Sequence, residues 1–365
     1  MIVVGGGVIG LSVAWRAAAA GHPVTVIDPT PGRGASWVAG GMLAPITEAW
    51  PGEEAALLLG EESLRRWPSF AERLAADGGD PGLSTAGTLV VALDQGDAGQ
   101  LAILAEYLES VGRAVERVTG RRLRSVEPGL SGATRGGLLV PGDLAVDNRK
   151  LLRSLRAAAE RHGVRFVAEE ATGIADGVVT TGSGEHTADV IVLSAGAHSG
   201  RLHPALSGAV RPLKGEILRL RARRTSLPPP SHTVRAVVEG RPVYLVPRAD
   251  GELVLGATQY EAGFDDAVTA RGVRELIESA ERIFPSIGEY ELVETAVGLR
   301  AASVDTLPFV GELGARVLAA TGHHRNGLLM APVTADAVVA WLAGEKPPEG
   351  IEAAHPARLG GPDVR

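Results

Sequence analysis

Apolar positions recur along most of the chain with the spacing of either a strand or a helix, and glycines separate these segments. The first segments predict one βαβ unit. Its parts are an apolar strand at 2–4, a glycine turn at 5–10, an alanine-rich helix at 11–20 and a second strand at 24–27. Residues 30–52 are rich in Gly, Pro, Ser and Ala without a period, which predicts a long functional loop.

The rest of the chain alternates between helical and strand-like patterns. Apolar residues at helical spacing predict helices at 53–74, 99–111, 147–162, 269–284 and 332–343. Shorter apolar or alternating runs predict strands at 85–93, 164–167, 189–193, 210–222, 233–248, 252–258 and 317–320. The Asp147-Asn148 pair is expected to cap the helix that starts there, and the tail after Gly344 is expected to be an exposed extension.

The order of these elements predicts an α/β protein of two domains. The βαβ features lie at both ends and in the middle, with antiparallel features between them. We therefore expect a discontinuous Rossmann-like, nucleotide-binding domain made of residues 1–85, 143–208 and 296–365. An inserted antiparallel-sheet (α+β) domain, made of residues 86–142 and 209–295, is expected to bind the substrate.

Composition excludes several kinds of chemistry. The 365 residues include no cysteine, which rules out a catalytic thiolate, a disulfide framework, an iron–sulfur cluster and a cysteinyl flavin. Glycine is abundant, at 48 residues against a usual share of roughly 7%. The net charge is −7 with no basic stripe for nucleic acid, and Arg16 interrupts the longest early apolar run. With no recognisable signal peptide, we expect a cytoplasmic protein that binds neither nucleic acid nor membrane.

The glycine turn has the spacing of a dinucleotide-binding motif. Gly5, Gly7 and Gly10 fit G-x-G-x-x-G between a strand and a helix, where the helix N-terminus offers free N–H groups to a pyrophosphate. Asp28 ends the second strand 18 residues after Gly10, where a carboxylate accepts ribose hydroxyls and repels a 2′-phosphate. This disfavours NADP and leaves FAD and NAD. Residues 35–42, which a simple NAD dehydrogenase would not need, favour FAD.

Seven motifs, taken in chain order, resemble the D-amino-acid oxidase superfamily and, within it, most closely the bacterial glycine oxidases of the thiamine pathway. They are VVGGGVIGL at 3–11, AGGML at 39–43, PLKGE at 212–216, YLVPR at 244–248, GAT at 256–258, GLR at 298–300 and TGHHRNG at 321–327. The resemblance extends from residue 1 to about residue 343. It implies noncovalent FAD and the oxidation of a small amino acid by O2, with hydride transfer from Cα to the flavin and release of hydrogen peroxide.

The resemblance also implies where the cofactor lies. Val8 and Ile9 would lie at the diphosphate, Asp28 and Pro29 at the ribose, and the backbone near Thr172 at the adenine side. Five residues would follow the cofactor toward its ring: Ala35, Ser36, Gly40, Gly41 and Met42. Small residues after an apolar strand, Ala195 and Gly196, suit a backbone that approaches a flat ligand. The pyrimidine end of the ring would be wrapped by His323, His324, Arg325, Asn326, Gly327, Leu328 and Leu329.

Three residues are expected to bind the substrate beside Met42. Arg300 would hold the substrate carboxylate with two charge-assisted hydrogen bonds, Tyr244 would add a hydroxyl, and Arg325 would be a second arginine on the substrate side. The alternatives are a surface arginine on a loop, a core aromatic residue and a structural arginine. No side-chain base is implied.

Other polar residues are not expected to take part in metal binding or catalysis. His323 and His324 have no carboxylate at ligand spacing, so a metal site is not expected. The pairs Glu53-Glu54 and Glu61-Glu62 are typical of a solvated helix face, and Lys214 of a structural ion pair.

Departures from the family pattern leave the substrate open. Pro242 stands where a histidine can occur, Gln259 replaces an apolar residue, and Ala301-Ala302 replace a frequent Pro-Gly. Sarcosine or a small D-amino acid is therefore an alternative to glycine, and a dehydrogenase an alternative to an oxidase. A non-catalytic nucleotide-binding module is a remote alternative. Expected partners are a small amino acid, O2, further copies of the chain in a dimer or tetramer, and thiazole-synthesis enzymes.

Overall fold

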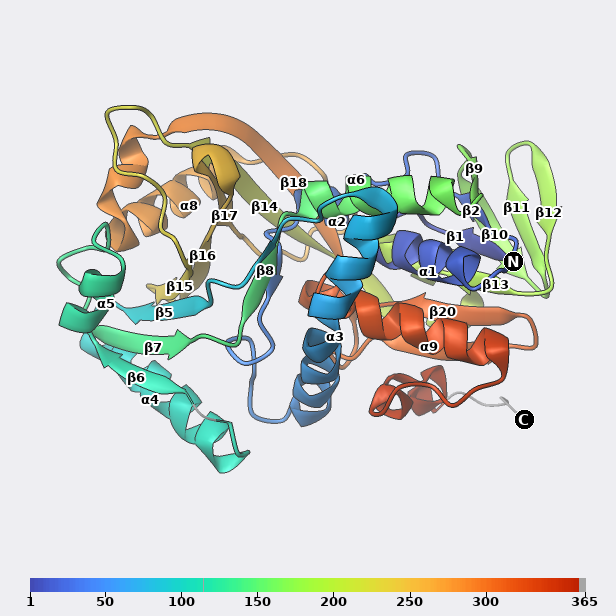
Figure 1. Cartoon of the computed structure of the whole chain (residues 1–365), viewed down its shortest axis with the longest axis horizontal. Coiled ribbons are helices and arrows are strands. Elements are labelled where there is room, and N and C mark those ends of the chain that lie inside the picture. The colour runs from blue at the N-terminus through green and yellow to red at the C-terminus, as the bar shows by residue number, and fades with distance from the viewer. Residues whose placement is uncertain (114, 361–365) are drawn as a thin grey trace.

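Two large sheets organise the computed structural model, which describes residues 1–113 and 115–360 (Figure 1). The first has six strands in the order β19-β20-β13-β1-β2-β9, all parallel except β19. Their bounds are β1 Ile2–Val4, β2 Thr25–Ile27, β9 Arg165–Val167, β13 Ile191–Leu193, β19 Phe309–Gly314 and β20 Val317–Thr321. The parallel order with helical crossovers is that of a doubly wound nucleotide-binding sheet.

Alternation along the short central strands gives this sheet two buried faces. Val3 and Val192 point into a core shared with four helices, whereas Ile2, Val4 and Ile191 belong to a second core on the opposite face. The helices are α1 Val8–Ala19, α3 Glu54–Gly78, α6 Asn148–Arg161 and α9 Ala331–Ala343. The second core is closed by the antiparallel strands β10 Ala171–Ala175, β11 Val178–Thr181 and β12 Gly184–Thr187, with α7 Ser199–Leu202.

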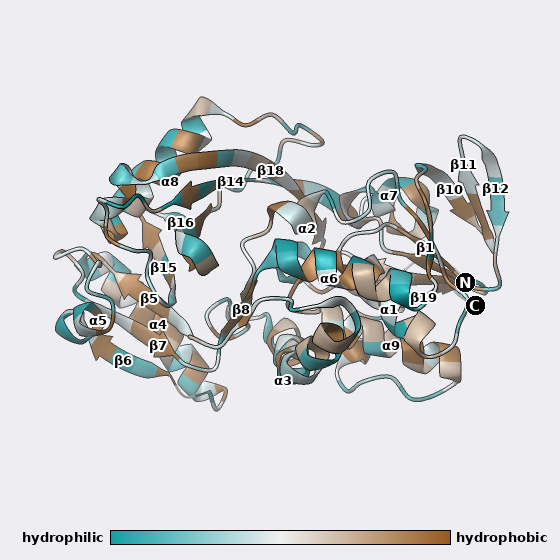
Figure 2. Ribbon diagram, turned by 45° about the horizontal axis from the view of Figure 1, so that its top comes forward, coloured by the Kyte–Doolittle hydropathy of each residue, from teal (hydrophilic) through white to brown (hydrophobic). Residues whose placement is uncertain are grey.

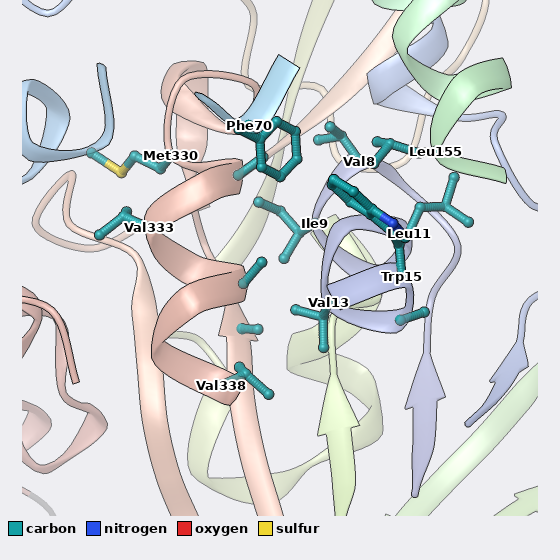
Figure 3. Packing of buried hydrophobic residues seen from close by; sticks show 14 of the residues in the cluster. Val8, Ile9, Leu11, Val13, Trp15, Phe70, Leu155, Met330, Val333 and Val338 are labelled. Carbon is teal, nitrogen blue, oxygen red and sulfur yellow. The ribbon is translucent and has the colours of Figure 1, made fainter. Parts of the chain in front are cut away.

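The helical core is held by large side chains from α1 and α3. Trp15 and Phe70 pack edge to face with ring centroids 5.1 Å apart, and both are almost completely buried. Figure 3 shows Ile9 and Val13 of α1 on the side of that helix that faces α9, and Val8 beside Leu155 of α6. This packing fixes the N-terminus of α1 against the sheet.

The second large sheet has eight strands in the order β18-β14-β17-β16-β15-β5-β7-β6. Their bounds are β5 Thr88–Ala92, β6 Glu116–Thr119, β7 Gly136–Val140, β14 Val210–Arg221, β15 Thr233–Val238, β16 Arg241–Pro247, β17 Glu252–Gly256 and β18 Glu291–Ser303. The helices α4 Gln95–Ser110, α5 Gly120–Val126 and α8 Ala270–Ile283 pack against it. Brown, hydrophobic residues lie along strands such as β5 and β7, while teal and brown alternate along α6 (Figure 2).

Two connections join the sheets. The long strands β14 and β18 reach from the second sheet toward the first, and β8 Leu144–Val146 lies between the sheets (Figure 1). β8 pairs with β3 Met42–Leu43 and β4 Leu83–Ser84. The expected α/β class is confirmed, and the additional eight-stranded sheet is antiparallel except where β5 and β15 pair in parallel. The domain limits stay a prediction. The strand β18 runs through the predicted boundary at residue 296.

Several predicted elements differ from the structure in instructive ways. The helix α1 begins at Val8, inside the glycine motif, because the last residues of the motif form its first turn. The sequence pattern does not predict β18, because this edge strand is mostly exposed or half-exposed in its first half and shows no clear alternation. The expected loop at 30–52 contains α2 Ala35–Val38 and β3. The prediction of an exposed tail is wrong for residues 351–359, where Ile351 and Ala354 are fully buried.

Among the described residues, none of the helices combines the length and the apolarity that crossing a bilayer requires.

Candidate functional site

The glycine turn between β1 and α1 is a cradle that side chains would fill. Gly5 has a φ of +104°, and a Cβ on it would lie 2.4 Å from the Ser194 carbonyl oxygen. A Cβ on Gly10 would lie 1.9 Å from the Gly5 carbonyl oxygen. Within the described chain, the amides of Gly7, Ile9 and Gly10 have no hydrogen-bond partner. Free amides at a helix N-terminus form an anion site, which fits a cofactor pyrophosphate.

Asp28 is held in place at the end of β2. Its two carboxylate oxygens accept hydrogen bonds from the amides of Gly6 and Thr30, both at 2.7 Å. The carboxylate is half-buried and keeps lone pairs for further donors such as ribose hydroxyls. Pro29, which follows it, is exposed. Thr172 lies on β10, and its hydroxyl donates to the Thr180 carbonyl on β11.

The end of β13 closes the other side of the turn. The Ser194 hydroxyl lies 3.0 Å from the Val4 carbonyl and 3.1 Å from the Gly5 carbonyl. A Cβ on Gly5 would also lie 2.8 Å from the Ala195 Cα, so this backbone approaches the turn closely. Gly196 follows with a φ of +55°.

Residues 35–42 connect the glycine turn with the eight-stranded sheet. The Ser36 hydroxyl accepts the Val8 amide at 3.0 Å, and Met42 pairs with Ala145 of β8. A Cβ on Gly40 would lie 2.6 Å from the Tyr244 ring, and one on Gly41 would lie 2.1 Å from the Val146 carbonyl oxygen. Ala35 lies below β18, where a Cβ on Gly298 would be 3.4 Å from its Cα. The segment is therefore packed from both sides.

Arg300 is a half-buried cation on β18. Its Nη1 donates to the Thr258 carbonyl at 3.3 Å, and within residues 1–113 and 115–360 it forms no ion pair. Its guanidinium lies over Gly215 of the neighbouring strand β14, where a Cβ would be 2.3 Å from Nη1. The missing side chain thus makes the space that the guanidinium occupies.

Tyr244 lies on β16 near Arg300. Its ring fits between two glycines, since a Cβ on its cross-strand partner Gly256 would lie 2.3 Å from the phenol oxygen. Burial raises the pKa of Tyr244, against a smaller lowering by the positive charge of Arg300. The phenol therefore stays protonated at neutral pH and can donate a hydrogen bond to an anion beside Arg300.

The segment 323–329 places two neutral imidazoles and a short helical turn before α9. His323 is buried with its Nε2 3.0 Å from the Thr334 hydroxyl, and burial lowers its pKa to about 3. Burial, together with the charges of Arg325, Arg300 and Arg211, lowers the pKa of His324 to about 4. Asn326 and Gly327 belong to this turn, and Leu328 and Leu329 are buried behind it. The described residues contain no group of three side chains suited to a metal ion.

Arg325 is neutralised, in contrast to Arg300. Its Nη2 donates to a Glu53 carboxylate oxygen at 2.6 Å, and its Nε lies 3.4 Å from Glu48. The prediction that Glu53 is simply solvated is therefore wrong, because Glu53 ends the loop before α3 and faces this arginine. Lys214 forms the expected ion pair, buried, with its Nζ 2.6 Å from Asp265.

The sequence predicts one buried residue of this region, Asn148, only as part of a helix cap. Asp147 alone caps α6, accepting the amides of Arg149 and Lys150 at 3.0 Å. Asn148 instead turns its side chain toward residues 36–37 and two arginines of the eight-stranded sheet. The sequence alone does not show that an Asn beside a cap residue is buried or which distant residues its side chain binds.

Comparison with known proteins agrees with the geometry. A family model described as FAD dependent oxidoreductase (DAO) matches residues 1–341. The glycine oxidase of Geobacillus kaustophilus is 32% identical over 346 residues, which cover 91% of this chain and 89% of that protein. The crystal structure of glycine oxidase from the same organism has a TM-score of 0.89 at 31% identity, covering 97% of each chain.

A second kind of relative is longer than this chain. The bifunctional protein ThiO/ThiG of Trichormus variabilis is 32% identical over 354 residues, covering 95% of this chain but 53% of that protein. The chain thus spans about half the length of the bifunctional relatives that it matches.

Proposed function

The chain belongs to the DAO family of FAD-dependent oxidoreductases, and from that premise we propose that it oxidises glycine or a similarly small amine to an imine. The imine then hydrolyses, for glycine to glyoxylate and ammonia, and O2 is reduced to hydrogen peroxide. The observation that carries the proposal is the half-buried guanidinium of Arg300, which has no carboxylate partner among the described residues. A carboxylate of the substrate is the partner that it lacks.

The residues present fit FAD. The glycine cradle, the free amides at the start of α1 and the fixed carboxylate of Asp28 suit the pyrophosphate and the adenosine ribose. Residues 35–42, 195–196 and 323–329 would hold the rest of the cofactor, with Met42 facing its ring. Bound FAD supplies the two-electron oxidation and passes the electrons on to O2.

The protein then contributes orientation. Arg300 binds the substrate carboxylate through two parallel hydrogen bonds, and the protonated hydroxyl of Tyr244 donates a third. Arg325, which Glu48 and Glu53 neutralise, shapes the site without attracting a second carboxylate. Neutral His323 and His324 add no charge at neutral pH. The chain thereby fixes the direction of Cα and the carboxylate end of the substrate.

The relatives suggest the pathway. The putative thiamine biosynthesis oxidoreductase ThiO of Rhizobium etli is 34% identical, and the bifunctional relatives share the name ThiO. We place this chain in the same role, delivering its imine to thiazole synthesis. Pro242 and Gln259, both exposed, differ from the glycine oxidase pattern and keep sarcosine and small D-amino acids as alternative substrates.

The test is peroxide release from the purified yellow protein with glycine, sarcosine, D-alanine and D-proline. The proposal expects peroxide with glycine and an equal amount of glyoxylate. Peroxide with D-alanine or sarcosine but not with glycine would show that the enzyme oxidises one of the alternative substrates instead of glycine. A yellow protein that releases none with any of the four would refute the oxidase.

A further inference from the structure

Asn148 is a buried hub between the segment 35–42 and the eight-stranded sheet. It is the first residue of α6 and is 0% exposed. Its Nδ2 donates to the carbonyl oxygens of Ser36 at 2.9 Å and Trp37 at 2.8 Å. Its Oδ1 accepts from Arg219 Nη2 at 3.0 Å and from Arg248 Nη2 at 3.3 Å. Both hydrogens and both lone pairs of the amide are therefore used.

The two arginines bring buried positive charge to this place. Arg219 comes from β14 and Arg248 follows β16, and neither forms an ion pair within the described chain. The Nε atoms of both are buried without a hydrogen-bond partner there. Burial lowers the pKa of Arg219, and it lowers that of Arg248 to about 10, so both stay charged at neutral pH. Glu294 is the cross-strand partner of Arg219 on β18, and its charge, like those of Asp147 and Glu252, opposes the effect of burial on Arg219; Asp147 and Glu252 do the same for Arg248.

Arg248 also contacts the segment directly. Its Nη2 donates to the Gly40 carbonyl at 2.6 Å, beside the ring of Tyr244. Three carbonyl groups of this segment are thus bound: those of Ser36 and Trp37 by Asn148, and that of Gly40 by Arg248. The backbone of the segment is fixed by side chains from α6 and the eight-stranded sheet.

Trp37 is clamped at the same place. The guanidinium carbons of Arg33 and Arg149 lie 4.1 and 4.4 Å from the centroid of its ring system. Arg149 in turn binds Glu294 of β18 with two hydrogen bonds, at 2.9 and 2.7 Å. The segment therefore cannot shift without breaking contacts to α6 and β18.

An acidic residue at position 148 would satisfy both arginines better than an amide does. Burying guanidinium groups without a carboxylate destabilises the fold, and a carboxylate at this position would reduce that cost. A carboxylate, however, would repel the Ser36 and Trp37 carbonyls and offset part of the positive charge of the two arginines. The amide keeps both the donors and the charge.

We propose that Asn148 is a positioning residue for the cofactor, which fixes residues 36–40 against FAD and keeps the charges of Arg219 and Arg248 available to reduced, anionic flavin. The inference rests on the placement of residues 35–42 beside the flavin ring, and it is independent of which amine is oxidised. Positive charge near the ring favours the reduced form and raises the midpoint potential.

Asn148→Asp tests the proposal, with Arg153→Gln, an exposed position on the same helix, as the control. Three quantities are measured without substrate: FAD affinity from quenching of flavin fluorescence, the flavin midpoint potential, and the melting temperature of the apoprotein. We expect Asn148→Asp to weaken FAD binding at least about tenfold and lower the potential, while the apoprotein melts at the same or a higher temperature.

Two results would overturn it. In the first, FAD affinity and potential match those of the control. In the second, FAD affinity and midpoint potential fall only when the melting temperature of the apoprotein also falls, which would show that Asn148 has a structural role. A second pair of variants separates charge from shape: Arg248→Met is expected to lower the potential and Arg248→Lys to restore it. Equal potentials in these two variants would refute the charge assignment. Because no readout uses an amine, a failure of the proposed substrate leaves these outcomes interpretable.

Discussion

Gly215 lies directly beneath the guanidinium of Arg300: a Cβ on Gly215 would be 2.3 Å from Nη1, 2.6 Å from Cζ and 2.7 Å from Nη2. The two residues lie on neighbouring strands, β14 and β18, whose register pairs Gly215 with Gly298. The position of the proposed carboxylate anchor thus depends on a residue that has no polar group.

Gly215→Ala is therefore expected to displace the Arg300 guanidinium. A displacement of about 1 Å at an anchor can cost roughly 100-fold in rate, so kcat/KM for the amine should fall by at least about tenfold. FAD content should not change. The control is Gly182→Ala, an exposed glycine with open space around its Cα. Steady-state kinetics of the two variants check this, and equal kinetics would show that Arg300 does not need this space.

Removing the anchor itself should act mainly on substrate binding. Arg300→Ala loses charge-assisted hydrogen bonds worth about 1.5–3 kcal/mol, which corresponds to roughly a ten- to 150-fold rise in apparent KM. The variant should remain yellow, because Arg300 lies outside the glycine cradle. An unchanged KM would contradict the assignment of Arg300 as the carboxylate anchor.

Tyr244→Phe should have a smaller effect than Arg300→Ala. It removes one hydroxyl donor at a cost of about 1 kcal/mol, or roughly a fivefold rise in KM. Since burial raises the pKa of Tyr244, its phenol stays protonated at alkaline pH, and the ratio of the two KM values should be constant from about pH 7 to about pH 9. A ratio that falls toward one over this range would show that the phenol ionises there.

Asp143 predicts a pH dependence of stability. It is 0% exposed, accepts the Thr47 hydroxyl at 2.8 Å, and burial raises its pKa to about 7. The folded protein therefore holds a proton that the unfolded chain has released. This stabilisation is complete below the ordinary Asp pKa and is lost as the pH rises through about 7.

Asp143→Asn should remove that loss. The melting temperature of the variant minus that of the parent should therefore increase from about pH 5 to about pH 8, as measured by thermal denaturation. Asp266→Asn, at an exposed carboxylate, is the control and should follow the parent curve. Parallel curves for Asp143→Asn and the parent would refute the raised pKa.

Local features of the site were predictable from the sequence, whereas contacts between distant segments were not. Gly5, Gly7 and Gly10 could be placed because their spacing belongs to one turn between adjacent elements. The pairing of Arg325 with Glu53, and of Arg300 with the space over Gly215, depends on strands and loops far apart in the sequence. The edge strand β18 was missed for the same reason: its register with β14, not its own pattern, makes it a strand.

Anaerobic mixing with glycine tests the central claim most directly, because it follows electron transfer to the flavin without any need for O2. We expect the visible flavin absorbance of the parent protein to bleach saturably, and the half-saturating glycine concentration to rise roughly ten- to 150-fold in Arg300→Ala. A flavin that stays oxidised with glycine, or that bleaches at the same concentrations in both proteins, would contradict the account.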